Sequence, residues 1–394
     1  MPALLADDGV AGTYARAVLS DVLAYAQTHA PAIAPSPAAV DTAMELGYAW
    51  RMGPFRLLAG LDAASRDRLG GLAAPALQRD GAGADRLTRA KTGAPIESNG
   101  AAALWDIGGG LGCLEIQTKM NAIDAGVLDM IEAALDRAVG QFSGLVIGNH
   151  NARAFSAGAN LSTMAAMIEA AHWAGIESFI ARGQAVYAAL RAAPVPVVAA
   201  MRGVALGGGC ELAMHCTATL AHAEAKVALP EHMVGLLPAW GGSTRLLARR
   251  GAQGAFAAAM LTRPPGSARE AGALGLLDPA QPIAMHADDV LDAAAALAER
   301  LVPGHAAPAP ARLIAAGPDA AQALLASLTL SDADRLIAEQ IAFVLTGGQA
   351  TAGSALTEDD LRALEREGFL ALARLPLTLD RIRHMLKTGK PLKT

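Results

Sequence analysis

A run of glycines, Gly207–Gly209, lies just before Glu211, and a second glutamate, Glu231, follows within the segment Leu-Pro-Glu. Glycine has no Cβ, so its backbone N–H can approach a substrate oxygen closely. Two carboxyl groups can move protons and position a water molecule. Together these residue types favour an enzyme that stabilises an enolate and performs acid–base chemistry beside it.

The glycine run follows a predicted strand and precedes a predicted helix, where backbone N–H groups have no partner inside the helix. The same glycines could equally serve tight packing of a helix against a sheet. A second turn of small residues, Ala154–Asn160, also follows a buried strand and precedes a helix, although alone it is typical of an ordinary loop. Two such turns after strands of one sheet could present two N–H groups to one carbonyl oxygen.

Glu231 lies in the largely apolar stretch Val227–Pro238. Apolar surroundings raise the pKa of a carboxyl group. Two carboxyls close to each other titrate at well-separated pH values, so one can act as a general acid while the other acts as a general base. Alternatively, a lone glutamate of this kind is favoured at a helix N-terminus by the helix dipole. The adjacent His232 is expected at the surface.

Strands alternate with helices between residues 101 and 300, which predicts an α/β unit with a largely parallel sheet. The expected elements are a hairpin at 103–107 and 113–116, strands at 145–148, 195–201 and 217–221, and helices at 125–139, at 176–192 and from Leu212.

The flanking regions have helical patterns. Residues 1–68 are expected to form a helical domain, with a first helix that ends before Pro31 and a third that begins after Pro54. Residues 69–100 are rich in Gly, Ala, Pro and Arg and are expected to form a linker. Residues 301–394 are expected to form a C-terminal helical region.

Composition narrows the class of protein. Hydrophobic residues make up 53% of the 394 residues and charged residues 18%, which predicts a large buried core. The net charge is −5 and the basic residues are scattered, so we expect no nucleic-acid partner. The longest apolar run, 195–201, is too short to span a membrane.

Sequence motifs narrow the class of protein further. The three cysteines lack the spacing of a disulfide framework or a metal site, and the N-terminus lacks a secretory signal pattern, so a cytoplasmic location is expected. The motifs G-x-S-x-G, H-E-x-x-H, the Walker motif and G-x-G-x-x-G are all absent.

Taken together, these motifs resemble the crotonase (enoyl-CoA hydratase/isomerase) superfamily over about residues 101–300. The segments that carry the resemblance are Thr118–Ala122, Ala154–Asn160, Arg202–Ala213 and Ala228–Ser243. The resemblance implies a crotonase-like ββα spiral core flanked by helical regions. The segment Val40–Phe55 is similar to the C-terminal helical domain of 3-hydroxyacyl-CoA dehydrogenases, as in multifunctional fatty-acid β-oxidation proteins.

The resemblance also implies roles for individual residues. The N–H groups of Ala157 and Gly208 would bind the thioester oxygen, Glu211 would activate water, and Glu231 would supply a proton, although the two glutamates could share or exchange these tasks. Substrate-binding positions would be Lys119, Ala122, Ala159, Asn160 and Gly207.

At two positions the sequence departs from the family pattern. Asn160 and Thr217 each stand where the family usually has aspartate. Neither departure removes a proposed catalytic group. Asn160 puts the positioning of the turn Ala154–Asn160 and its acyl-chain or CoA contacts in doubt.

The function implied is hydration of the 2,3 double bond of an enoyl-CoA in fatty-acid β-oxidation. The alternatives are a double-bond isomerase of the same fold and a catalytically silent acyl-CoA-binding module. The partner would be an acyl-CoA thioester, and no cofactor, metal or NAD site is expected, nor is dehydrogenase activity. The family also implies a homo-oligomer, trimer-like if the helical flanks permit it.

Overall fold

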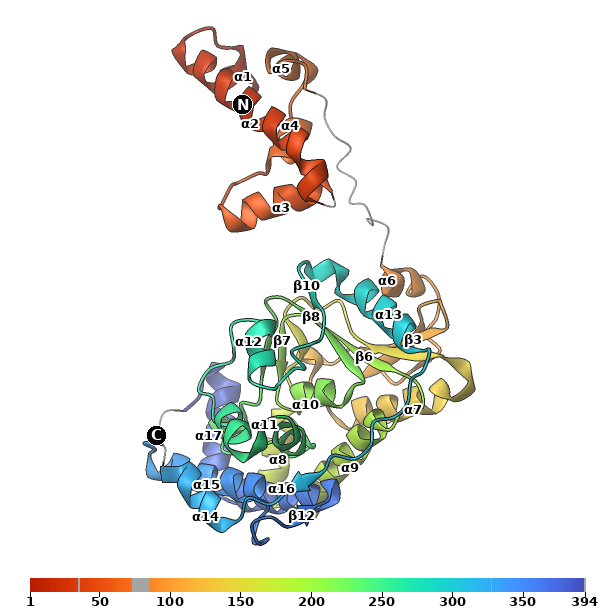
Figure 1. Ribbon diagram of the computed structural model, residues 1–394, viewed down its shortest axis with the longest axis vertical. Coiled ribbons are helices and arrows are strands. Elements are labelled where there is room, and N and C mark those ends of the chain that lie inside the picture. Colours follow the sequence, from red (N-terminus) through yellow and green to blue (C-terminus); the bar gives the residue numbers. More distant parts are fainter. Residues whose placement is uncertain (35, 73–84, 327, 393–394) are drawn as a thin grey trace. The chain divides into compact units, whose positions relative to one another are not determined.

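The computed structural model describes residues 1–34, 36–72, 85–326 and 328–392. It divides into two compact units, Met1–Ala84 and Asp85–Thr394 (Figure 1). Of the linker predicted at 69–100, residues 73–84 lie outside the described residues. Residues 85–100 belong to the larger unit and contribute α6 (Arg86–Ala90) and β1 (Glu97–Ser98) to it.

The smaller unit is helical. It contains α1 (Pro2–Ala6), α2 (Val10–Ile33), α3 (Pro37–Gly47), α4 (Pro54–Ala59) and α5 (Ala63–Arg68), packed around a small cluster of buried leucines, Leu5, Leu23, Leu58, Leu61 and Leu69.

The first helix of this unit was predicted to end before Pro31, which is wrong, because α2 continues to Ile33. Pro31 lies in the last turn, where its missing N–H costs one hydrogen bond, and the Ala34 N–H still reaches the Ala30 carbonyl at 3.0 Å.

The larger unit contains a seven-stranded sheet in the order β1-β2-β3-β4-β6-β8-β10. Its first three strands are antiparallel and the remainder run parallel, so the predicted hairpin and parallel sheet are both confirmed. The bounds of the strands after β1 are β2 (Ala102–Asp106), β3 (Leu111–Ile116), β4 (Gly144–Ile147), β6 (Val197–Met201), β8 (Ala218–His222) and β10 (Ile283–Ala284).

Alternating side chains of this sheet enter two separate cores. Cys113 packs in the cluster that contains α13 (Val290–Leu301), whereas its neighbour Leu114 packs in the cluster that contains α7 (Ala125–Gln141). Helix α9 (Trp173–Arg191) packs against α7. The sheet is therefore covered on both faces, as an α/β fold with parallel strands requires (Figure 1).

A second, three-stranded parallel sheet positions the candidate chemistry. Its order is β5 (Ala154–Ser156), β7 (Val204–Leu206), β9 (Lys226–Ala228). The candidate residues of the sequence follow these three strands. The remaining strand pair is β11 (Leu313–Ile314) with β12 (Ala355–Leu356).

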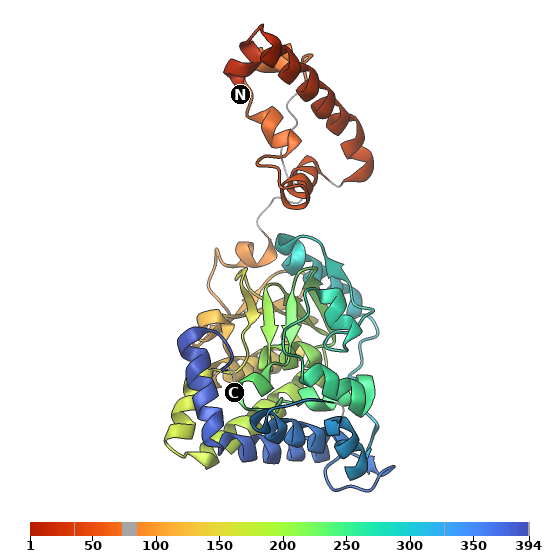
Figure 2. The ribbon, with the colours of Figure 1, turned by 90° about the vertical axis from the view of Figure 1, so that its left-hand side faces the viewer.

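The C-terminal helices pack into the same core as the sheet and form part of the larger unit. In Figure 2 they are blue and lie beside the yellow-green helices, in agreement with contacts of α17 with α8 and of α16 with α9. The bounds of these and the remaining helices are α8 (Leu161–Glu169), α10 (Gly208–His215), α11 (Gly242–Ala259), α12 (Ala268–Ala273), α14 (Pro318–Ala326), α15 (Asp332–Thr346), α16 (Glu358–Ala373) and α17 (Pro376–Thr388), with short 3-10 helices η1 (Lys119–Asn121), η2 (Glu231–Val234) and η3 (Ala287–Asp289).

Among the described residues, no helix has the length and apolar character needed to cross a membrane.

Candidate active site

The glycine run forms the first turn of α10, which begins at Gly208 rather than at the predicted Leu212. Glycines weaken an isolated helix, but close packing requires them at this position. A Cβ on Gly208 would lie 2.6 Å from the Trp240 ring, and one on Gly209 would lie 2.6 Å from Ser156. The run therefore serves tight packing and also leaves N–H groups at a helix start, so the two interpretations are compatible.

The second turn lies against the first, because β5 and β7 are parallel neighbours. Gly158 has a φ of +88°, which favours glycine. A Cβ at this position would lie 2.6 Å from the Leu206 carbonyl oxygen and 3.1 Å from the Gly208 nitrogen. The absence of a side chain at Gly158 thus lets the two turns approach each other.

One predicted oxyanion donor is wrong. The Ala157 N–H donates to the Met120 carbonyl at 3.1 Å, so it is not free to bind a substrate oxygen. The Ala159 and Gly208 N–H groups have no acceptor within the described part of the chain, and the Ala159 nitrogen lies 3.4 Å from a Cβ built on Gly208. The structure therefore favours Ala159 with Gly208 as the donor pair.

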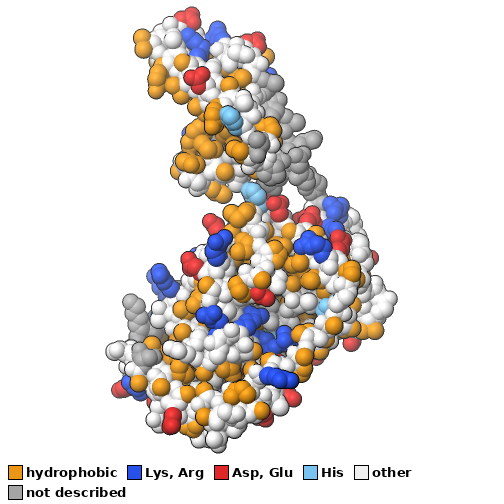
Figure 3. Space-filling model, viewed as in Figure 1, with side chains coloured by type: hydrophobic (Ala, Val, Ile, Leu, Met, Phe, Trp, Pro, Cys, Tyr) orange, Lys and Arg blue, Asp and Glu red, His pale blue; other side chains and the backbone are white. Residues whose placement is uncertain are grey.

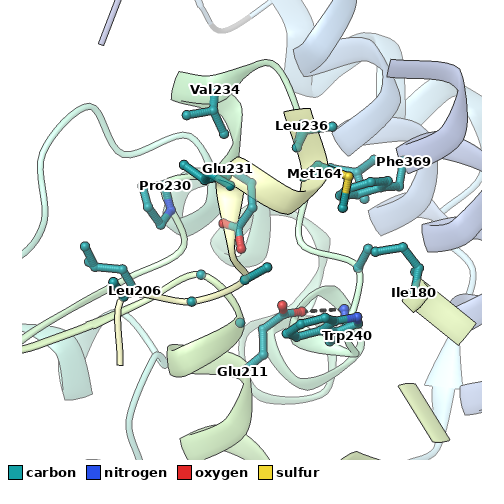
Figure 4. A pocket seen from close by; sticks show the side chains of 18 of the residues that line it. Met164, Ile180, Leu206, Glu211, Pro230, Glu231, Val234, Leu236, Trp240 and Phe369 are labelled. Atoms are coloured by element: carbon teal, nitrogen blue, oxygen red, sulfur yellow. Dashed lines mark hydrogen bonds between the residues drawn. The ribbon is translucent and has the colours of Figure 1, made fainter. Parts of the chain in front are cut away.

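Glu211 comes from the first turn of α10 and is buried, with 2% of its surface exposed. Its Oε1 accepts hydrogen bonds from the backbone N–H groups of Trp240, drawn in Figure 4, and of Gly242, both at 2.8 Å. Burial raises the pKa of Glu211 well above its ordinary value, and the charge of Glu231 raises it further.

Glu231 is the first residue of η2, and a Cβ on Gly207 would lie 2.9 Å from its Oε1. Its Oε2 is buried and has no hydrogen-bond partner among the described residues. Burial raises the pKa of Glu231 to about 8. The expected surface position of the adjacent His232 is wrong, because His232 is buried, and burial lowers its pKa to about 4.

Both carboxyl groups face a single cavity of about 230 Å³. Figure 4 shows Glu211 and Glu231 approaching this space from opposite sides. Apart from these groups the wall is mostly apolar, and it includes both turns. The other lining residues are Ala157, Gly158, Ala159, Leu161, Met164, Ile180, Leu206, Gly207, Gly208, Pro230, Val234, Leu236, Leu237, Ala239, Trp240, Phe369 and Met385.

A third carboxyl group, Glu365, lies next to the site and was not predicted as part of it. It comes from α16 and is completely buried. Burial raises its pKa to about 7. One signal could have revealed it: Glu365 lies on the apolar face of its helix, four residues after Leu361 and four before Phe369.

Glu365 and Glu211 hold the same loop. The N–H groups of Trp240 and Gly242 donate to Glu211, whereas that of Gly241 donates to Glu365 at 2.9 Å. A further bond to Glu365 comes from the Thr244 N–H at 3.2 Å. The loop that orients Glu211 is therefore itself fixed from α16.

Helix α17 supports the segment of Glu231 in a similar way. The Thr378 hydroxyl donates to the Gly235 carbonyl at 3.0 Å, and Arg381 donates to the His232 carbonyl at 3.0 Å. His232 belongs to η2, and Gly235 is the residue that ends it. The two C-terminal helices thus secure both carboxyl-bearing segments.

The remaining predicted binding residues lie in or near the two turns. Gly207 and Ala159 line the cavity, whereas Lys119, Ala122 and Asn160 are not among the residues described as lining it. The exposed Lys119 and its neighbour Ala122 lie in or beside η1, which contacts β5. The Asn160 side chain caps α8 by accepting the N–H groups of Ser162 and Thr163.

The residues described show no cluster of three or more His, Cys, Asp or Glu that could bind a metal ion. The three cysteines are buried and unpaired.

Comparison with known proteins gives a consistent result. The sequence model of the family described as enoyl-CoA hydratase/isomerase matches residues 109–326. A probable enoyl-CoA hydratase of Mycobacterium bovis is 37% identical over 45% of this chain and 66% of its own length. A carnitinyl-CoA dehydratase of Mycobacterium thermoresistibile shares the fold, with a TM-score of 0.57 and 18% identity, over 74% of this chain and 91% of that one.

One relative matches the whole of this chain. A probable 3-hydroxyacyl-CoA dehydrogenase of Bacillus subtilis is 29% identical over 100% of the chain, which covers 56% of that relative. The chain thus spans about half the length of this curated relative, and the smaller unit lies within the match.

Proposed function

This chain belongs to the enoyl-CoA hydratase/isomerase family, and on that premise we propose that it adds water reversibly across the 2,3 double bond of an enoyl-CoA thioester. The observation that carries the proposal is the pair Glu211 and Glu231 in one apolar cavity, beside two backbone N–H groups that have no acceptor among the described residues. The presence of both glutamates argues for hydration, since relatives that only shift a double bond often keep one.

The N–H groups of Ala159 and Gly208 would bind the thioester oxygen. Their positions support this role, because both are free and the Gly208 N–H is at the positive end of α10. As water adds to the β-carbon, negative charge develops on the thioester oxygen, and preorganised donors stabilise it without reorganisation.

The hydrogen bonds divide the acid and base roles. Burial raises the pKa of both carboxyls, so the pair would hold one proton at neutral pH. Two N–H donors favour the negative charge on Glu211, whereas Oε2 of Glu231 has no donor among the described residues, so Glu231, with its pKa of about 8, would carry the proton. Glu211 would take a proton from water as its oxygen bonds to the β-carbon, and Glu231 would give its proton to the α-carbon. These two transfers leave the proton on Glu211, so a proton would then pass from Glu211 to Glu231, directly or through solvent, to restore the starting state, and no cofactor beyond the CoA of the substrate is needed.

Purified protein should hydrate a short 2-enoyl-CoA, measured as loss of the absorbance of the conjugated thioester. Glu211→Gln and Glu231→Gln should each reduce the rate by about 10²–10⁴-fold, as expected for loss of a general acid or base. Glu224→Gln, at an exposed position outside the cavity, is the control. Near-normal turnover by either folded cavity variant would exclude the mechanism.

The same experiment separates the alternatives. An isomerase would exchange the α-proton with deuterium from the solvent and move the double bond without net addition of water. A silent module would bind the thioester tightly and turn over no enoyl-CoA. We also propose that the chain has no dehydrogenase activity of its own, which reduction of NAD by a 3-hydroxyacyl-CoA in the presence of pure protein would contradict.

A further inference from the structure

A second cavity, of about 310 Å³, lies at the other end of α10. Its wall is mainly polar, in contrast to that of the first cavity. In Figure 3, Lys and Arg side chains gather around a hollow in the lower half of this face of the molecule. The residues that line the cavity are Arg191, Ala213, Met214, His215, Cys216, Thr217, Ala218, Thr219, Arg249, Leu276, Leu277, Asp278, Gln281, Ala306 and Pro308.

Two arginines of this wall have no ion pair in the described part of the chain. Arg191 is partly buried, and Arg249 donates only to backbone carbonyls, of which the nearer is Gly275 at 2.9 Å. The neighbouring Arg245 is paired with Glu358. Burial lowers the pKa of Arg191, and the positive charges of Arg245 and Arg249 lower it further, while the charge of Glu358 offsets part of this lowering.

Few groups in the wall offset this charge. Asp278 is an exposed carboxylate that also accepts the Ala280 N–H. His215 is neutral, because burial lowers its pKa to about 3, and the buried Cys216 thiol is neutral with a pKa of about 12. Thr217 stands where the family usually has aspartate, so this position adds no carboxylate. The cavity therefore keeps a net positive charge.

The wall also contains a buried polar atom without a partner. Thr219 is 6% exposed, and its hydroxyl has no hydrogen-bond partner among the described residues. Leaving a buried hydroxyl unsatisfied is unfavourable unless a ligand or water completes it. Thr219 lines this cavity and also a neighbouring one, so a ligand or a water in either could complete its hydroxyl.

We propose that this cavity binds a small phosphate-bearing anion, at a site separate from the acyl-CoA cavity. Guanidinium groups present paired N–H donors that match phosphate oxygens, and a threonine hydroxyl and the Gln281 amide add neutral donors. The two cavities share no lining residue, because Glu211 and the start of α10 face the first and the end of α10 faces the second.

Titration of the full chain with inorganic phosphate and with pyrophosphate, at constant ionic strength set by chloride, tests the site. Thermal unfolding and calorimetry should show saturable binding that stabilises the protein. Arg191→Ala and Arg249→Ala should each weaken binding at least tenfold, as loss of a charge-assisted hydrogen bond predicts. Arg335→Ala, at an exposed position that does not line the cavity, should bind as the parent does.

Equal binding by all four proteins, or no binding at millimolar concentrations, would refute the site. Thr219→Val gives a sharper test, because removal of an unsatisfied hydroxyl should raise the unfolding temperature without phosphate and weaken phosphate binding. A variant that is less stable and binds phosphate normally would contradict the role of Thr219. Competition between free CoA and phosphate would show that the cavity is not a separate site.

Discussion

Two cavities at the two ends of α10 contain opposite charges in opposite surroundings. At the start of the helix, Glu211 and Glu231 lie in an apolar cavity, whereas at its end Arg191 and Arg249 lie in a polar one. The helix dipole favours negative charge at its start and cations at its end. The difference shows how surroundings determine protonation: the apolar wall keeps a proton on the carboxyl pair, whereas the polar wall leaves charge that an anion can neutralise.

Apart from the carboxyl pair itself, the largest effect should come from separating the two turns of the apolar cavity. In Gly158→Ala, the added Cβ would meet the Leu206 carbonyl and push against the Gly208 nitrogen, which displaces the donors of the oxyanion. Loss of one such donor costs about 10²–10³-fold in kcat. Turnover of a short enoyl-CoA by the folded variant measures the effect.

Gly140→Ala is the matched control, because Gly140 also has a positive φ, of +84°, but no atom lies within 4 Å of an added Cβ. It should lose some stability and retain its turnover. Equal losses of turnover in the two variants would mean that backbone strain, and not the donor pair, is responsible.

The next largest effect should come from the loop at residues 240–244, which Glu211 and Glu365 both hold by hydrogen bonds. Glu365→Gln replaces one acceptor oxygen with a donor that faces the N–H groups of Gly241 or Thr244. The displaced loop should misorient Glu211 and lower kcat by about tenfold to a hundredfold, with a smaller change in KM. Glu367→Gln, at an exposed position on the same helix, should behave as the parent. An unchanged kcat in Glu365→Gln would mean that α16 does not help to position the catalytic groups.

Glu365 also makes stability depend on pH. Its pKa is raised from 4.5 to about 7 on folding, so the folded state binds this proton more tightly than the unfolded chain. The free energy of unfolding should therefore fall as the pH rises through this interval. Chemical denaturation at several pH values should show a smaller decrease in Glu365→Gln, and an identical decrease would contradict this assignment.

The pH dependence of turnover tests the apolar wall itself. Hydration requires a proton on Glu231, whose pKa is about 8, so kcat/KM should fall above about pH 8 by about tenfold per unit. A profile that stays flat to pH 10 would mean that the proton comes from another group.

Parts of this arrangement could be predicted from sequence because they are local. The triple glycine, Glu211 and the second turn each follow a strand closely, and parallel strands bring their ends together. Which N–H group is free could not be predicted from sequence. The Ala157 N–H donates to the carbonyl of Met120 in η1, a residue far away in the sequence. The buried position of His232 likewise involves a residue far away in the sequence, because Arg381 of α17 donates to its backbone carbonyl.

Glu365 illustrates the same limit. Its helix pattern marks it as buried, but only the tertiary fold shows that it meets the loop of Glu211. The C-terminal helices flank the core, as predicted, and they also line the cavity and hold the loops of its two carboxyl groups.

The smallest effect should be a change of substrate preference. Phe369 of α16 is buried and lines the apolar cavity together with Met164 and Ile180. Phe369→Ala should lengthen this cavity and favour longer enoyl-CoA chains, with kcat/KM rising about fourfold for each methylene newly accommodated, since burial of one contributes about 0.8 kcal/mol. Phe343→Ala, which removes a partly buried ring outside the cavity, should leave the preference unchanged. If both variants kept the parental preference across a series of chain lengths, the acyl tail would have to lie elsewhere, and the contrast between an apolar substrate cavity and a polar anion cavity would fail at its apolar end.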